Sequence, residues 1–294
     1  MAIKKYRYYF GPYGDVQLLP SVIRGAEVSP GPIFYGSRNR SLVGTPTQLY
    51  YGSRRQWSLT WPENMTEDTA RPMLRMESAY RMRIQRPYLF LDTKNTNYLP
   101  PDVSTLSSEN NPFEIFVWGN GTTTRTNTGV FHSELAGISD GYLTHTGAVS
   151  TSSFSCRFQL PIIAGSQYLF SGFFSGSGTI KLAYNFFDAN GAYIASVISG
   201  NIVLAGTTTG TLQSMTMAAA SVPAGSVAFN VGYIEQTVGV VCNTNGWMVQ
   251  YDETSRPTNG FLPGAGGAQV IVESVGWTYT THKLRQYRAV VNEV

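Results

Sequence analysis

The chain has 294 residues, of which 42% are hydrophobic and 13% aromatic, and its formal net charge is +3. This much apolar surface can offset the entropy lost on folding, which excludes a disordered chain. No run of five basic residues and no window of 18 apolar residues occurs, so we expect neither a nucleic-acid partner nor a membrane span. The first six residues lack the apolar segment of an export signal, and we therefore expect synthesis in a cytosol.

Charged residues are distributed unevenly along the chain. Residues 1–111 carry 14 basic and nine acidic side chains, residues 112–262 carry four and seven, and residues 263–294 carry three and two. The net charges of the three segments are +5, −3 and +1. Because the two ends share a composition that the middle lacks, we predict one domain made of residues 1–111 and 263–294, interrupted by an inserted domain of residues 112–262.

Short apolar runs separated by the 30 Gly and 15 Pro residues are typical of an all-β protein. In the first segment, a hairpin-like region at residues 42–51 is bracketed by arginines and rich in tyrosine, a composition suited to a protein interface. We expect it to project toward a neighbouring subunit. The candidate subunit-interface residues are Arg38, Arg40, Tyr50, Tyr51, Arg54, Arg55 and Arg75. For Arg75, a solvated helix face is the alternative interpretation.

The clearest strand covers residues 56–61, where Trp57, Leu59 and Trp61 alternate with polar residues. Pro62 ends it, and the one predicted helix follows at about residues 67–82. Acidic residues at its start and arginines at its end suit the helix dipole. Pro72 fits only in a first turn, so the helix could begin at Thr69.

From residue 113 onward, roughly eight or nine short strand-like runs predict a β-sandwich of jelly-roll type. Residues 188–191, Asp-Ala-Asn-Gly, predict a tight hairpin turn in which Asn190 and Gly191 both take positive φ angles. A Gly- and Pro-rich linker at residues 257–267 closes the insert. Two final strands, at residues 268–274 and 285–294, are expected to complete the sheet of the first segment.

Residues for catalysis or metal binding are sparse, and we expect no enzyme activity, metal or cofactor. The three histidines have no metal-ligand spacing. Glu134 and Asp140 are the only pair considered for glycoside hydrolysis, and a turn explains Asp140 more simply. A structural calcium would need oxygen ligands that cannot be identified from the sequence. Cys156 and Cys242 match no redox or zinc motif, and whether they pair stays open.

Sugar recognition by a β-sandwich uses aromatic faces with amide and carboxylate groups nearby. The candidate carbohydrate contacts are Trp118 with Asn120, Tyr142 and Tyr233, each next to polar loop residues. The alternative for each aromatic residue is a place in the core or at a strand end. Trp247 is expected in the core because it alternates with polar or flexible neighbours.

Three stretches resemble a known family: residues 86–92 with 97–101, residues 185–193, and residues 246–251 running into 261–265. They are similar to minor tail proteins of siphophages that infect actinobacteria, which are related to distal tail proteins. The resemblance implies a distal-tail-like β-sandwich domain that forms a ring, commonly a hexamer, with an inserted carbohydrate-binding-like jelly roll displayed outward. The implied partners are the tail tube, the tail hub or tip and a host cell-surface polysaccharide. The implied location is the virion, after assembly in the host cytoplasm.

Three other functions remain open from the sequence. The protein could be a polysaccharide-degrading tail enzyme, a free lectin, or a virion protein whose insert serves only for packing or decoration. The missing export signal counts against the free lectin.

Overall fold

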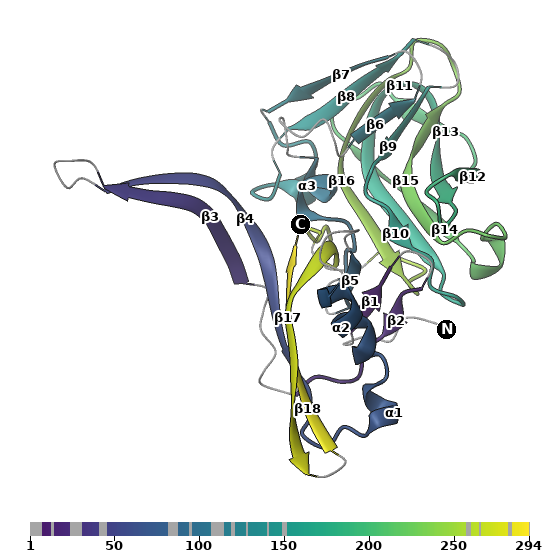
Figure 1. Cartoon of the computed structure of the whole chain (residues 1–294). Helices are drawn as coiled ribbons and strands as arrows, with labels where there is room; N and C mark the ends of the chain where they lie inside the picture. The colour runs from purple at the N-terminus through teal and green to yellow at the C-terminus, as the bar shows by residue number, and fades with distance from the viewer. Residues whose placement is uncertain are drawn as a thin grey trace. The chain divides into compact units, whose positions relative to one another are not determined.

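The structure is a computed structural model, and most of its described residues lie in β-strands (Figure 1), which confirms the all-β class. Only the backbone is described at residues 31–40, 46–54, 102 and 115–118. The described residues are 8–12, 15–23, 31–40, 46–81, 88–93, 96–106, 115–118, 121–127, 129–139, 141–148, 152–256, 260–264, 266–281 and 284–293.

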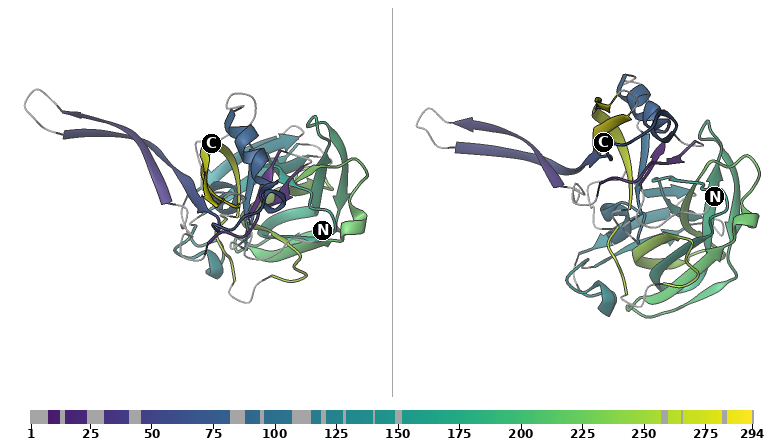
Figure 2. Two further views of the ribbon diagram at one scale, coloured as in Figure 1. Left: turned by 60° about the horizontal axis from the view of Figure 1, so that its bottom comes forward. Right: turned by 90° about the horizontal axis from the view of Figure 1, so that it is seen from below.

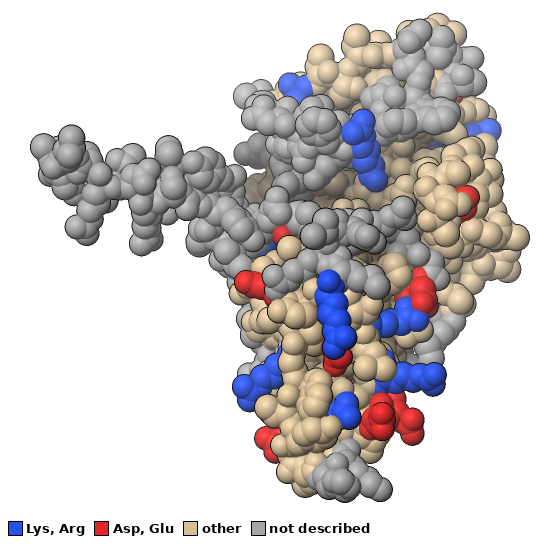
Figure 3. All heavy atoms as spheres, viewed as in Figure 1, with Lys and Arg blue, Asp and Glu red and all other residues tan. Residues whose placement is uncertain are grey.

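The chain divides into two compact units. One, the terminal unit, consists of residues 7–12, 16–90 and 268–294, and the other, the sandwich unit, consists mainly of residues 91–267. The sandwich unit is therefore wider than the predicted insert of residues 112–262. Charged side chains are dense over the elements of the terminal unit and sparse over the visible strands of the sandwich unit (Figure 3), as the uneven charge of the sequence requires.

The terminal unit contains a seven-stranded sheet in which the first and last segments of the chain are neighbours. β18 pairs with β4 in antiparallel register, with Ala289 opposite Leu59 and Val291 opposite Trp57. The strand order is β2 (Gln17–Leu18), β1 (Tyr8–Gly11), β5 (Tyr88–Asp92), β17 (Gly267–Thr281), β18 (Leu284–Glu293), β4 (Pro46–Thr60) and β3 (Gly31–Arg40). The predicted final strands thus join the sheet that the first segment begins.

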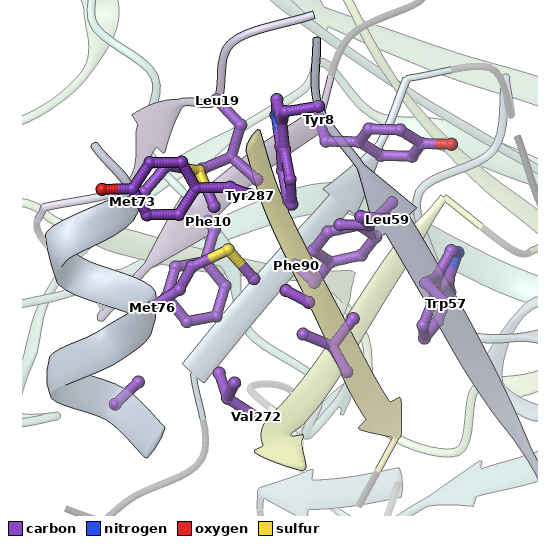
Figure 4. Close-up of a cluster of buried hydrophobic side chains, with 14 of the residues drawn as sticks. Tyr8, Phe10, Leu19, Trp57, Leu59, Met73, Met76, Phe90, Val272 and Tyr287 are labelled. Atoms are coloured by element: carbon purple, nitrogen blue, oxygen red, sulfur yellow. The ribbon is translucent and has the colours of Figure 1, made fainter. Parts of the chain in front are cut away.

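The core of this unit lies between the sheet and a helix (Figure 4). The predicted alternation at residues 56–61 is confirmed, since Trp57, Leu59 and Trp61 are 1%, 3% and 0% exposed. From the helix, Met73 and Met76 are fully buried against them. Burial of such large side chains stabilises the unit by about 1.5–3 kcal/mol each.

The single predicted helix is in fact two, α1 (Glu67–Ala70) and α2 (Met73–Arg81). Thr66 caps α1, because its hydroxyl accepts a hydrogen bond from the Thr69 backbone N–H at 3.4 Å. Pro72 causes the break, since it has no N–H to continue the helical pattern and its ring clashes with the preceding turn. A third helix, α3 (Pro101–Thr105), was not predicted.

β3 and the first part of β4 form a two-stranded ribbon, shown from two further sides in Figure 2. Their register runs from Gly31 opposite Gln56 to Arg40 opposite Pro46. β18 pairs with β4 only from residue 56 onward, so in the described structure the rest of the ribbon has no other strand beside it. The predicted hairpin at residues 42–51 falls partly in this ribbon and partly, at residues 42–45, outside the described residues.

The sandwich unit is organised by one long strand, β11 (Tyr168–Phe187). Its first part pairs with β14 and β16, and its last part pairs with β12, β13 and β15. Gly176 lies between these two parts of β11. Its φ is +114°, and an added Cβ would lie 1.9 Å from the Val241 carbonyl oxygen. Only glycine fits there.

The pairing along β11 divides the strands into two half-sheets, one bonded to its first part and the other to its last part. The first half-sheet contains β14 (Thr211–Met217), β11, β16 (Val241–Tyr251), β8 (Tyr142–Gly147) and β7 (Gly121–Thr126). The second contains β12 (Tyr193–Ile198), β13 (Ile202–Ala205), β11, β15 (Ala228–Glu235), β10 (Leu160–Pro161), β9 (Ser153–Cys156) and β6 (Ile115–Trp118).

Aromatic rings from both half-sheets meet in the core. Trp247 of β16 packs edge-on against Phe154 of β9, with ring centroids 5.8 Å apart, and is 0% exposed, as predicted. Its Nε1 donates to the Thr244 hydroxyl at 2.6 Å, which satisfies the one polar atom of the indole. Cys156 and Cys242 are both buried and free.

The hairpin at Asp188 forms where it was predicted but in a different way. Gly191 has a φ of +79°, whereas Asn190 does not take a positive φ. The Asp188 carboxylate instead accepts hydrogen bonds from the backbone N–H groups of Asn190 and Ala192, both at 2.8 Å. The side chain of Asp188 thus stabilises the turn, and only one residue has to adopt the left-handed conformation.

Asn97 explains why the sandwich unit begins before residue 112. Its amide nitrogen lies 2.8 Å from Ser104 Oγ and 3.0 Å from the carbonyl oxygens of Trp247 and Leu262. Its carbonyl oxygen accepts the backbone N–H groups of Leu99 and Val249. One buried side chain therefore ties together residues 97–104, β16 and Leu262, which include parts of two of the three family-like stretches.

Candidate functional site

The four predicted carbohydrate contacts do not come together in one described site. Trp118 stands opposite Ser153 in the β6–β9 register, but its side chain lies outside the described residues, as does all of Asn120. Tyr142 is half-buried at the start of β8. Tyr233 is 0% exposed in β15.

Tyr233 is a core residue, which corrects its assignment as a sugar contact. Its ring stacks on Phe154 at 5.4 Å and meets Phe174 edge-on at 5.9 Å. Burial, followed by the neighbouring Cys242 and Glu235, raises the pKa of Tyr233 well above its ordinary value. No face of this ring is available for a sugar.

Next to Tyr233, a buried contact between a histidine and a carboxyl group joins the two half-sheets. Nδ1 of His145 in β8 lies 2.8 Å from Oε1 of Glu235 in β15, and the side chains are 1% and 0% exposed. Gly147 lies directly against the pair, since an added Cβ would be 1.4 Å from Glu235 Oε2. The arrangement holds the sandwich together and gives a substrate no access from the surface.

Tyr142 belongs to a second cluster, which we call the loop cluster: Phe131, His132, Glu134, Tyr142, Phe173 and Arg256. It covers the outer face of the first half-sheet. Tyr142 packs on Phe131 with centroids 5.0 Å apart. His132 stacks on Phe173 at 4.0 Å, and the guanidinium of Arg256 lies 4.7 Å from the centre of the Phe173 ring.

An ion pair between Arg256 and Glu134 holds the loop cluster together. Arg256 Nη2 lies 3.0 Å from Glu134 Oε2, and the side chain of Arg256 is only 9% exposed. Burial lowers the pKa of Arg256, and the charge of Glu134 opposes this shift. The pair ties the chain after β16 to the loop at residues 131–135. Tyr142 is half-buried beside it, so its role as a sugar contact stays a prediction.

Of the predicted interface residues, Arg55 is held within the terminal unit. Its Nε and Nη2 donate to the two carboxylate oxygens of Glu293 at 2.9 and 2.6 Å, and its Cζ lies 5.1 Å from the Trp57 ring centre. Arg75 is half-buried on α2. Arg38 and Arg40 lie in β3, and Tyr50, Tyr51 and Arg54 lie in β4, with side chains outside the described residues, so their role stays a prediction.

The structure also shows exposed aromatic residues that the sequence interpretation missed. Trp277 and Tyr279 on β17 are 40% and 58% exposed, with their ring centroids 4.7 Å apart. The guanidinium of Arg285 on β18 lies over both rings, at 4.6 and 5.2 Å. Tryptophan, tyrosine and arginine are the residues enriched where protein interfaces are strongest. The alternation of Trp277 and Tyr279 with two threonines was the available signal.

Among the described residues, no three His, Cys, Asp or Glu side chains converge in a way that could hold a metal ion. His282 and Asp140 fall outside the described residues. None of the described helices is both long enough and apolar enough to cross a bilayer.

No protein-family model matches the chain. No curated protein matches it either. Among solved structures, a xylan-binding CBM22 domain of Paenibacillus barcinonensis Xyn10C is 8% identical over 55% of this chain and 99% of that domain, with a TM-score of 0.40. The family 11 carbohydrate-binding module of the Clostridium thermocellum cellulase Lic26A-Cel5E is 7% identical over 52% of this chain and 95% of the module, with a TM-score of 0.32.

The enzymatically active domain of bacteriophage CBA120 tailspike protein 4 is 15% identical over 52% of this chain, with a TM-score of 0.37. Its match spans only 22% of the tailspike chain. Likeness at these scores is too low to assign an activity or a ligand to this protein.

Proposed function

We propose that this protein is a structural component of a bacteriophage tail that presents a glycan-binding sandwich to the host surface. Copies of the terminal unit form a ring that joins the tail tube to the tip of the tail. The sandwich unit contacts a host polysaccharide. The protein is located in the virion and catalyses no reaction.

The observation that supports this proposal best is the pairing of β18 with β4. It brings the two ends of the chain into one sheet, while residues 91–267 leave that sheet after β5 and return at β17. A terminal unit whose two ends pair in one sheet can assemble through its own surface, because the inserted unit folds around a separate core. Repeated copies on a ring would turn weak sugar contacts into tight binding by raising the effective concentration.

The ring is tested by measuring the mass of the purified protein in solution and by locating it in tail particles by electron microscopy. We expect a particle about six times the 32.2 kDa mass of one chain. A protein that stays monomeric at all concentrations and is absent from virions contradicts the proposal.

Glycan binding is tested by sedimenting the full-length protein with purified actinobacterial cell walls. We expect the protein in the pellet, and its release by soluble wall polysaccharide. The same incubation tests the enzymatic alternative, because a hydrolase would release reducing ends from the walls over time and a binding protein would not.

A further inference from the structure

A row of hydrogen-bonded polar residues crosses the outer face of the second half-sheet. In β11, Tyr184 and Phe186 are 0% exposed and face the core, so Asn185 between them faces outward. Asn185 stands opposite Ser196 of β12 and opposite Asn230 of β15. The three side chains therefore form one line across β12, β11 and β15, whose ribbons can be followed in Figure 1.

The row holds an exposed tyrosine in place. Asn185 Nδ2 donates to Asn230 Oδ1 at 2.9 Å, and the Ser196 hydroxyl donates to Asn185 Oδ1 at 2.6 Å. The hydroxyl of Tyr193 lies 2.8 Å from Ser196 Oγ and ends the row. Tyr193 is nevertheless 53% exposed. Its ring is thus fixed at one end by hydrogen bonds in series while much of its surface remains in contact with solvent.

The groups in this row carry no charge. They are two amides, one aliphatic hydroxyl and one phenol, and the nearest carboxylate in the sequence, that of Asp188, accepts the backbone N–H groups of its own turn. Asn230 is 5% exposed and accepts the hydrogen bond of the Asn185 amide, so it holds the row in place, whereas Asn185 is half-buried. An aromatic ring with neutral donors and acceptors suits an uncharged sugar, whose ring has an apolar face and a rim of hydroxyl groups.

We propose that Tyr193, Ser196 and Asn185, supported from within the sheet by the buried Asn230, form a binding site for a neutral saccharide. The ring of Tyr193 stacks on the apolar face of one sugar residue, and the half-buried Asn185 amide and Ser196 hydroxyl bond its hydroxyl groups. Because the hydrogen-bonded row already orders the tyrosine, little side-chain entropy is lost on binding. This inference rests on the glycan binding proposed above and names the surface that performs it, within the family-like stretch at residues 185–193.

The test uses the full-length protein in affinity gel electrophoresis with soluble arabinogalactan, a neutral polymer, and with polygalacturonate, an acidic one. For Tyr193→Ala we expect an affinity for arabinogalactan lower by at least about tenfold, the usual effect of truncating a residue that dominates an interface. Tyr193→Trp should retain binding because it keeps an aromatic face. Tyr279→Ala is the matched control, since Tyr279 is a similarly exposed tyrosine, at 58%, in the terminal unit.

Each outcome has a distinct meaning. If the unmodified protein binds cell walls and arabinogalactan and only Tyr193→Ala loses affinity, the site is supported. If Tyr193→Ala binds as well as the unmodified protein, the proposed site is wrong while glycan binding stands. A preference for polygalacturonate overturns the neutral class of ligand. If the unmodified protein binds no cell-wall preparation, glycan binding itself fails, and the site fails with it.

Discussion

Arg55 and Glu293, which are 238 positions apart in the sequence, are joined by hydrogen bonds at the point where the two-stranded ribbon leaves the sheet. The Glu293 carboxylate also accepts the backbone N–H of Arg55 at 3.1 Å. The pairing of β18 with β4 begins at Gln56, so Arg55 is the first residue of β4 beyond the paired part. The last strand thereby holds the base of the ribbon.

Replacing Glu293 by alanine is expected to loosen this base. Hydrogen bonds to charged groups contribute about 1.5–3 kcal/mol. The two side chains are 14% and 21% exposed, which weakens the contact, so we expect the substitution to lower the free energy of unfolding by about 1 kcal/mol. Hydrogen exchange of the amides in β4 and β18 should become several-fold faster. Arg81→Ala, an exposed arginine at the end of α2, should leave these rates unchanged. Equal rates in Glu293→Ala would show that the contact does not stabilise the ribbon.

The strand at residues 56–61 could be predicted because its signal is local: every second residue is large and apolar, and each of these is buried. Tyr233 could not be placed in this way. Almost every residue of β15 is buried on both faces, so the strand has no alternation, and the polar residues beside Tyr233 suggested a surface loop. Glu235 is buried because it pairs with His145, a partner 90 positions away that no local pattern identifies.

The row that ends at Tyr193 was missed for a related reason. Residues 188–191 were interpreted as a turn, which was right, and the residues on either side were interpreted only as strands. Asn185 and Ser196 meet because the turn sets the register of β11 against β12. The available signal was an amide three residues before the turn and a hydroxyl five residues after it, and a register shift between Phe186 and Phe187 brings the two opposite each other. Asn230 joins them only through the pairing of β15, which the sequence does not specify.

The buried pair of His145 and Glu235 leads to a prediction about stability. Removing one partner leaves the other buried without its hydrogen bond, which costs about 1–3 kcal/mol. We therefore expect His145→Ala and Glu235→Ala each to lower the midpoint of thermal unfolding markedly. The double variant His145→Leu/Glu235→Leu should be less destabilised than either, because it leaves no buried polar group without its partner. If the single variants unfold like the unmodified protein, the pair does not hold the half-sheets together.

A further prediction concerns Asn97 at the start of the sandwich unit. Replacing it by alanine leaves the carbonyl oxygens of Trp247 and Leu262 and the N–H of Val249 without this partner, at about 1 kcal/mol or more each. We expect Asn97→Asp to be nearly as harmful, because a carboxylate cannot donate to the two carbonyl groups. Urea unfolding followed by tryptophan fluorescence measures the loss. Asn201→Ala, at an exposed asparagine, serves as the control, and an equal effect of both alanine substitutions would contradict the assigned role.

Buried phenols and a buried thiol predict how the sandwich unit responds to alkaline pH. Burial raises the pKa of Tyr168, Tyr184 and Cys242 above their ordinary values. These groups therefore stay protonated in the folded protein at a pH at which the unfolded chain ionises. Their contribution to stability is complete below the unfolded pKa values, about 8.5 for the thiol and about 10 for the phenols, and is lost as the pH rises toward the folded values.

The free energy of unfolding should thus stay constant between about pH 7 and 8 and then fall, with each buried group adding about 1.4 kcal/mol per pH unit above its unfolded pKa. Urea unfolding at a series of pH values measures this slope. Tyr184→Phe should reduce the fall of the unfolding free energy per pH unit by the contribution of one group. It also loses the hydrogen bond to the Met215 carbonyl oxygen at 2.9 Å. If tyrosinate absorbance shows all 18 tyrosines ionising near pH 10 in the folded protein, the phenols are not protected as the packing requires.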